Sequence, residues 1–214
     1  MRAKSLLPYV PYVLVGAFHL ATLAVHDTTL STISKWFLMP ALILAILLGG
    51  LLRPGADPGG RIVAVLALGV AFSWAGDVML NVPGDIGFLI GLGAFFLAHV
   101  TYLVLFVTHL RVRRVPWQVG FFALWWLALV AILAPHAGVL LVPVALYGLV
   151  LGASASASLA CNRWVATGGI LFLISDTILA FKLFWPTFEL VQADLIIMVL
   201  YLGAQGFIVF GATR

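Results

Sequence analysis

The sequence predicts an all-α membrane protein, a bundle of about eight transmembrane helices with both termini in the cytoplasm. Apolar residues occupy 64% of the 214 positions and charged residues only 8%, and the mean hydropathy is +1.20. Soluble domains are roughly half apolar and a quarter charged, so this composition excludes a soluble enzyme, a disordered chain and a nucleic-acid-binding module. The apolar blocks are continuous, whereas the segments of a transmembrane barrel would alternate in polarity.

Four helices are predicted in the first half of the chain, over residues 8–25, 36–52, 61–82 and 86–108. A bilayer crossing takes roughly 20 mostly apolar residues, and each block is close to that length. The first block follows a basic start, as in a signal peptide, but it is long enough to span and no small-residue cleavage site follows it. Pro- and Gly-rich stretches at 53–60 and 83–85 and the Arg-rich stretch 111–116 separate the blocks.

Four further helices are predicted in the second half. Residues 115–162 contain no Asp, Glu, Lys or Arg and are too long for one crossing, so Pro135-His136-Ala137-Gly138 is expected to divide them into two helices. The last two helices are predicted over 164–184 and 193–212. No linker is long enough to separate a second domain, so residues 1–214 are expected to form one transmembrane domain.

The loop charges predict the orientation. With eight helices, one side of the membrane holds nine basic residues and the other side only Lys35 and Lys182. Cytoplasmic loops retain positive charge, so the side with nine is expected to be cytoplasmic, in a multi-pass protein of a cell membrane such as the bacterial cytoplasmic membrane. The same bias explains the net charge of +4 without a nucleic-acid partner. The nine are Arg2, Lys4, Arg53, Arg61, Arg111, Arg113, Arg114, Arg163 and Arg214.

The sequence predicts neither a metal nor a cofactor. Cys161 is the single cysteine, which excludes an intrachain disulfide and a thiolate cluster. Zinc hydrolases generally use three protein ligands, and only two histidines fall within the predicted membrane helices. Neither a phosphate-binding glycine loop nor a dinucleotide-binding fingerprint is present.

Two aspartates are the leading candidates for function, because an ionisable group inside a membrane helix is costly. Asp77 and Asp176 both occur as a small residue, Asp, two residues and Leu, in the third and seventh predicted helices, which run in the same direction. Both are expected at mid-depth or somewhat towards the outer side of the membrane, and Gly76 and Ser175 beside them allow close helix approach. The alternative interpretation is that each Asp only bonds a neighbouring helix.

Two carboxyl groups that meet in a low-dielectric pocket cannot both ionise easily, so we expect them to share one proton. Such a pair offers an acid and a base together, which suits hydrolysis or a proton relay. His99, in the fourth predicted helix, is expected at a similar depth and able to contact Asp77, with Tyr102 on the same helix face. His19 is interpreted as structural, and Asp194 lies near a helix end.

Two more polar residues have alternative interpretations. Lys35 is predicted just before the second helix, where it could meet a phosphate or simply anchor the helix end at the interface. Gln205 is a buried amide in the last helix, which could contact substrate or join two helices.

Several short motifs in order resemble the YhhN/lysoplasmalogenase family over nearly the whole chain. They are Gly76-Asp77-x-x-Leu80, then Phe88, Gly91, Phe95, Ala98-His99 and Tyr102, then Ser175-Asp176-x-x-Leu179-Ala180, then Tyr201 and Ala204-Gln205. One departure is clear: the family carries Thr-Lys-Pro before Met-Pro in the second helix, where this chain reads Ser34-Lys35-Trp36-Phe37-Leu38-Met39-Pro40.

The resemblance implies hydrolysis of the vinyl ether bond of lysoplasmalogens, giving a fatty aldehyde and a glycerophospho head group. It implies that Asp77 and Asp176 are the catalytic pair, supported by His99, Tyr102 and Ser175. It also makes Lys35, Tyr201 and Gln205 the expected substrate contacts, with a lysophospholipid in the bilayer as the partner. The alternatives are a proton-coupled transporter, a lipid-binding membrane protein, and a metal-dependent lipid amidase.

Overall fold

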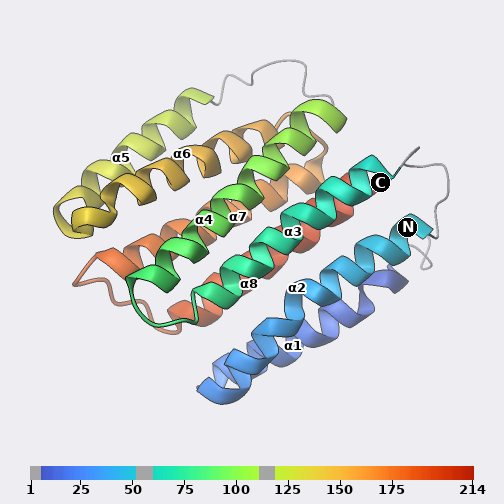
Figure 1. Ribbon diagram of the computed structural model, residues 1–214, viewed down its shortest axis with the longest axis horizontal. Coiled ribbons are helices and arrows are strands. Elements are labelled where there is room, and N and C mark those ends of the chain that lie inside the picture. The colour runs from blue at the N-terminus through green and yellow to red at the C-terminus, as the bar shows by residue number, and fades with distance from the viewer. Residues whose placement is uncertain (1–5, 52–59, 111–118) are drawn as a thin grey trace.

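The computed structural model describes residues 6–51, 60–110 and 119–214, and these residues are almost entirely helical (Figure 1). They contain no strand, which confirms the all-α prediction. Three short helices adjoin the α-helices: η2 (Leu7–Tyr9), the π-helical η3 (Leu105–His109) and η4 (Gly138–Leu140). The α-helices are α1 (Val10–Ala24), α2 (Thr28–Leu51), α3 (Arg61–Met79), α4 (Asp85–Val104), α5 (Val119–Ala137), α6 (Leu141–Ser158), α7 (Arg163–Phe184) and α8 (Ala193–Ala212).

The helices are long and apolar enough to cross a membrane. Within the described residues, seven stretches meet this condition, and one of them, Val119–Ser158, contains both α5 and α6. Figure 1 shows α5 and α6 folded back side by side, so they form a hairpin. The protein is therefore a multi-pass membrane protein, and eight remains the predicted number of crossings.

Four helices form the centre of the bundle. Helices α3, α4, α7 and α8 pack together, the α1–α2 hairpin covers α3 and α8 on one side, and the α5–α6 hairpin covers α4 and α7 on the other (Figure 1). Large side chains fill the interior, among them Tyr102, Phe106 and Phe172, which are almost fully buried. In this arrangement seven of the helices, all except α5, contribute residues to the lining of one internal cavity.

The start of α1 and the end of α8 lie at the same end of the bundle. The Tyr9 hydroxyl lies 3.2 Å from Thr213 Oγ1, and the Tyr9 ring packs edge-on against Phe210. The guanidinium groups of Arg163 and Arg214 both lie over the ring of Trp164 at this end.

Of the nine basic residues assigned to the cytoplasmic side, Arg61, Arg163 and Arg214 are described. Arg61 and Arg163 begin α3 and α7, and Arg214 follows α8. Lys182 lies in the last turn of α7, toward the other end. Arg2, Lys4, Arg53, Arg111, Arg113 and Arg114 lie outside the described residues. The cytoplasmic location of the termini remains a prediction.

The second helix begins earlier than predicted. Helix α2 starts at Thr28 rather than at residue 36, with the Leu30 amide donating to Asp27 Oδ1 at 2.9 Å. Lys35 therefore lies inside α2, and its predicted place ahead of the helix is wrong. Hydropathy missed the first two turns because they are rich in Ser and Thr, and several of these side chains face an internal pocket rather than lipid.

The third helix ends earlier than predicted, at Met79 rather than at residue 82. Beyond it, the amides of Asn81 and Val82 bond back only three residues, to the carbonyls of Val78 and Met79, in a turn that leads to Pro83. Proline disfavours helical backbone in the residue before it. Asp77 was expected well inside this helix. It lies instead in the last turn of α3, because the helix ends at Met79.

Small residues bring the central helices close together, as predicted. A Cβ on Gly76 would lie 2.5 Å from Phe95 Cδ2 of α4, so this glycine is required for the α3–α4 contact. On α7, the Ser175 hydroxyl donates to the carbonyl of Ile197 on α8 at 3.0 Å. These contacts hold the helices that carry the two aspartates against their neighbours.

Candidate active site

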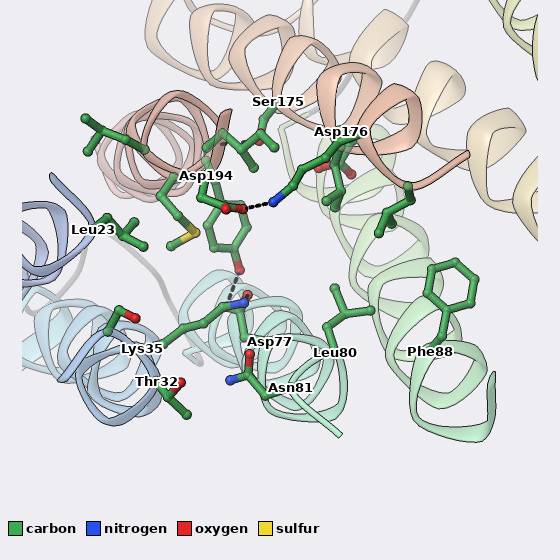
Figure 2. Close-up of a pocket in the computed structure, with 18 of the residues that line it drawn as sticks. Leu23, Thr32, Lys35, Asp77, Leu80, Asn81, Phe88, Ser175, Asp176 and Asp194 are labelled. Atoms are coloured by element: carbon green, nitrogen blue, oxygen red, sulfur yellow. Dashed lines mark hydrogen bonds and ion pairs between the residues drawn. The ribbon is translucent and has the colours of Figure 1, made fainter. Parts of the chain in front are cut away.

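A cavity of about 690 Å³ opens inside the bundle. Its lining includes residues of the turns between α1 and α2, between α3 and α4, and between α7 and α8, so it lies toward the end opposite the termini. This volume falls within the range of roughly 300–1,000 Å³ that is typical of small-molecule sites. Asp77 and Asp176 both line it, and Figure 2 shows them entering from different helices.

The cavity has a polar side and an apolar side. Helices α1 and α2 contribute mostly polar residues, whereas α4 and the end of α7 contribute mostly apolar ones. Figure 2 shows Thr32 and Lys35 of α2 and Phe88 of α4. The polar residues are His19, Thr22, Thr28, Ser31, Thr32 and Lys35, and the apolar residues are Phe88, Leu92, Phe95, Val144, Leu179 and Leu183. An amphipathic molecule is the kind of ligand that such a division fits.

Asp77 lies against a cation and a phenol. Lys35 Nζ of α2 lies 3.7 Å from Asp77 Oδ1, and the Tyr201 hydroxyl of α8 donates to Oδ2 at 2.8 Å. The Asp77 side chain is only 5% exposed. Burial disfavours a charge on this carboxyl, whereas the nearby ammonium group and the hydrogen-bond donor both favour it, so the surroundings of Asp77 compensate part of the cost of its ionised form.

Asp176 has a different environment. The Tyr147 hydroxyl of α6 donates to Asp176 Oδ2, and no basic side chain forms an ion pair with this carboxyl in the described part of the chain. Among residues 6–51, 60–110 and 119–214, no direct hydrogen bond joins the two carboxyl groups. Each Asp instead accepts a hydrogen bond from its own tyrosine. Sharing of one proton by the pair thus remains a prediction.

Gln205 and Tyr102 lie beside the cavity rather than on its lining. Gln205 Nε2 of α8 donates to Ser73 Oγ of α3 at 2.9 Å, and the Tyr102 hydroxyl donates to Gln205 Oε1 at 2.6 Å. Ser73 precedes Asp77 by one helical turn, and Gln205 follows Tyr201 by one turn. The Gln205–Ser73 and Tyr201–Asp77 hydrogen bonds therefore join α3 and α8 at two successive turns. Gln205 therefore joins α8 to α3 and α4, one turn away from Tyr201.

His99 is buried among aromatic rings. Its Nδ1 lies 2.8 Å from Ser154 Oγ of α6, rather than at Asp77, the partner that the sequence suggested. The imidazole packs edge-on against Phe172, Tyr147 and Tyr102. His99 thus packs against Tyr147, the residue that donates to Asp176. Ser175, whose hydroxyl bonds Ile197, lines the cavity beside Asp176.

Two residues on the cavity wall were missed or undervalued. Tyr147 lies in the long uncharged stretch of the sequence, where one Tyr among apolar residues carries no signal, and only the packing of α6 on α7 brings it to Asp176. His19, interpreted as structural, lines the cavity, with Nδ1 2.8 Å from Ser34 Oγ. No three His, Cys, Asp or Glu side chains gather as metal ligands within the described ranges.

The fold and the site together define a multi-pass helical membrane protein with a carboxylate-bearing amphipathic cavity. The chain belongs to the YhhN family, which it matches over residues 30–212. This match includes every helix that lines the cavity except α1. The resemblance seen in the sequence motifs is thus confirmed.

Two curated relatives are similar over most of the chain. Lysoplasmalogenase TMEM86B of Homo sapiens is 34% identical over 171 residues, which is 74% of this chain and 67% of that protein. Lysoplasmalogenase TMEM86B of Rattus norvegicus is 32% identical over 166 residues, 73% of this chain and 65% of that protein. The matched region thus spans about two thirds of the length of these relatives. No solved structure matches the chain.

Proposed function

We propose that this protein hydrolyses the vinyl ether bond of a lysoplasmalogen, a phospholipid with a single alkenyl chain, to a fatty aldehyde and a glycerophospho head group. The relatives named lysoplasmalogenase support this function. The observation that carries it is the division of the cavity into a polar and an apolar side with Asp77 and Asp176 between them. In a lysoplasmalogen, the reacting bond also lies between a polar head group and an apolar chain.

The division of the cavity suggests how the substrate binds. The alkenyl chain lies along Phe88, Leu92 and Val144, which replace the apolar surroundings that this chain has in the bilayer. The head group lies toward Thr32 and Lys35 on the side of α1 and α2. The vinyl ether then reaches the level of the two carboxyl groups.

Asp176 is the proposed acid. Vinyl ethers are hydrolysed by proton transfer to the alkene carbon that does not carry oxygen, and in this binding mode that carbon is on the chain side, toward α7. Tyr147 donates to Asp176 Oδ2, which leaves the other carboxyl oxygen to carry the proton. Transfer of this proton forms a carbon–hydrogen bond and leaves an oxocarbenium ion at the oxygen-bearing carbon, with Asp176 ionised.

Asp77 is the proposed base. Its carboxylate, held by Lys35 and Tyr201, lies on the head-group side, where it stabilises the positive charge and takes a proton from the attacking water. Water addition gives a hemiacetal. Cleavage of its carbon–oxygen bond to the glycerol oxygen, with transfer of the hemiacetal hydroxyl proton to that oxygen through water, releases the aldehyde and the glycerophospho alcohol. The proton held by Asp77 is returned to Asp176 through water.

Asparagine substitutions test this function. Asp77→Asn and Asp176→Asn keep the size of each side chain, and each is expected to reduce aldehyde release from lysoplasmalogen by about 10²–10⁴-fold. Asp85→Asn is the control, because Asp85 is an exposed acid in the first turn of α4 that does not line the cavity. Full turnover by either cavity variant would contradict the assignment.

Proton-coupled transport is the competing function, since two buried carboxyls could also relay protons. The purified protein, incubated with lysoplasmalogen, distinguishes the two. Aldehyde release supports the hydrolase, whereas lysolipid-driven acidification of proteoliposomes without any aldehyde supports the transporter.

A further inference from the structure

Lys35 holds a primary amine inside the cavity, beside one of the two carboxyl groups. Its side chain lines the cavity and is 18% exposed, and Nζ lies 3.7 Å from Asp77 Oδ1. Figure 2 shows Lys35 reaching from α2 toward Asp77. A lysine amine is a nucleophile that forms Schiff bases with carbonyl compounds. The reaction proposed above releases such a compound, a fatty aldehyde, in this cavity.

The carbonyl carbon of that aldehyde is formed near the amine. In the proposed reaction, water attacks the oxygen-bearing carbon of the vinyl ether and gives a proton to Asp77, so this carbon lies within reach of the Asp77 carboxylate. Lys35 approaches the same carboxylate from α2. The chain meanwhile remains along the apolar side of the cavity, at Phe88 and Leu92. An aldehyde held by its chain meets the amine at a high effective concentration.

Lys182, the other described lysine, does not share these surroundings. It also lines the cavity, but it lies in the last turn of α7 and pairs with Asp194, whose side chain is 63% exposed. Lys4, the third lysine of the chain, lies outside the described residues. Within residues 6–51, 60–110 and 119–214, Lys35 is therefore the lysine that lies beside a buried carboxylate.

We propose that Lys35 captures a fatty aldehyde as a Schiff base, which makes this lysine a reversible covalent site for the product. That the aldehyde forms in the cavity rests on the proposed function. The Asp77 carboxylate takes a proton from the Lys35 ammonium group, and the freed amine bonds to the carbonyl carbon. One proton moves from nitrogen to the carbonyl oxygen, which gives a carbinolamine. Asp77 protonates its hydroxyl, which leaves as water while the nitrogen lone pair forms the carbon–nitrogen double bond.

This exchange conserves the charges of the buried pair. The ammonium group is replaced by an iminium group with the same positive charge, and Asp77 ends as the carboxylate that it was at the start. Loss of one partner from a buried ion pair would leave an uncompensated charge at a high cost, and the Schiff base avoids that cost. Addition of water reverses the steps, so capture delays release of the aldehyde without ending turnover.

Reductive trapping tests the site in the detergent-solubilised full chain. Hexadecanal is the probe, sodium cyanoborohydride reduces an imine to a stable secondary amine, and peptide mass spectrometry measures alkylation at Lys4, Lys35 and Lys182. We expect Lys35 to be alkylated about tenfold faster than the other two lysines or more. A saturated alkyl-ether lysolipid, which has no bond to cleave, should protect Lys35. Equal rates at the three lysines, or no protection by the lysolipid, would overturn the proposal.

Variants and a short aldehyde identify the cause of selective alkylation. Asp77→Asn removes the group that moves the proton, so alkylation of Lys35 should slow by about tenfold or more. Lys182→Arg is the matched control and should leave the rate at Lys35 unchanged. Propanal has no chain to bind along the apolar side, so it should show no preference for Lys35. The same preference with propanal as with hexadecanal would contradict capture through the chain.

Direct supply of the aldehyde keeps this test distinct from the proposed function. Selective alkylation of Lys35 by hexadecanal, without aldehyde release from lysoplasmalogen, would contradict the hydrolase and support the lysine site. Aldehyde release from lysoplasmalogen without selective alkylation of Lys35 would contradict the Schiff base and leave the hydrolase supported.

Discussion

At the scale of single residues, the two aspartates differ in what surrounds them. Asp77 has an ammonium group and a phenol within reach, whereas Asp176 has a phenol alone among its described hydrogen-bond and ion-pair partners. Acid–base catalysis needs two groups in opposite protonation states, and unlike environments are the usual way to obtain them. The difference therefore supports Asp176 as the acid and Asp77 as the base.

The charge of Lys35 is expected to keep Asp77 ionised. In Lys35→Met the Asp77 carboxylate loses its cation in a buried position and takes up a proton, so kcat for aldehyde release should fall about 10–100-fold. Lys35→Arg keeps the positive charge and should retain more activity than the Met variant. Equal activity of the Met and Arg variants in a lysoplasmalogen assay would show that the charge is not needed.

Tyr147 is expected to position Asp176. In Tyr147→Phe the carboxyl loses the donor that holds Oδ2, so we expect kcat to fall by about tenfold or more with little change in KM. Tyr12→Phe is the matched control, because the Tyr12 hydroxyl is also buried but donates to the carbonyl of Leu202 outside the cavity lining. A rise in KM with kcat unchanged would instead assign Tyr147 to substrate binding.

At the scale of helices, close packing between α7 and α8 determines the shape of the cavity. These helices carry Asp176 and Tyr201, and they are joined at Gly168 and Ser175. Tyr201 reaches Asp77 only because α8 also packs on α3. A change in the α7–α8 distance is therefore expected to disturb both carboxyl groups at once.

Gly168→Ala tests this packing. The added methyl group would lie 2.7 Å from Ile208 Cγ1 and 2.8 Å from the Ala204 carbonyl, so the helices must separate, at a cost of about 1–3 kcal/mol. The melting temperature in detergent should fall by several degrees. Gly93→Ala on α4 meets open space, and it should leave stability unchanged or slightly raised. Equal melting temperatures of the two variants would contradict the tight contact.

At the scale of the whole molecule, the cavity and the chain termini lie at opposite ends of the bundle. The start of α1 and the end of α8 meet at Tyr9, Thr213 and Phe210. The cavity reaches the α1–α2, α3–α4 and α7–α8 turns at the other end. If the termini are cytoplasmic, as the loop charges predict, the end of the bundle that the cavity reaches faces the outer side of the membrane.

Labelling of introduced cysteines tests this orientation. Val191 is 85% exposed between α7 and α8, and Arg214 is exposed at the end of the chain. In intact cells, a membrane-impermeant maleimide should label Val191→Cys, and it should label Arg214→Cys only after the membrane is permeabilised. The opposite pattern would invert the topology.

The native Cys161 provides a low background for this measurement. Burial raises the pKa of the Cys161 thiol to about 11. The thiolate is the reactive form, so a raised pKa leaves little of it at neutral pH, and labelling of Cys161 should be slow there. Rapid labelling of the unsubstituted protein at neutral pH would contradict this, and Cys161→Ser would then be needed as the background.

The sequence alone was sufficient for the fold class and for the two carboxyl groups. Apolar blocks of the required length predict membrane helices because the transfer of side chains to lipid is local and nearly additive. Asp77 and Asp176 were recognisable because a charge within such a block is rare and costly. The same reasoning misplaced the start of α2, because its Ser and Thr residues face the cavity, where they need no apolar character.

Only the tertiary structure decided which groups meet. Tyr201 and Asp77 are 124 positions apart, Tyr147 and Asp176 are 29 apart, and nothing in the local pattern of either tyrosine distinguishes it from a core residue. The local sequence pattern also does not indicate the polar and apolar sides of the cavity, because their residues come from different hairpins. Hydropathy depends on each residue separately, whereas a site depends on which helix faces pack together, and that is a property of the whole bundle.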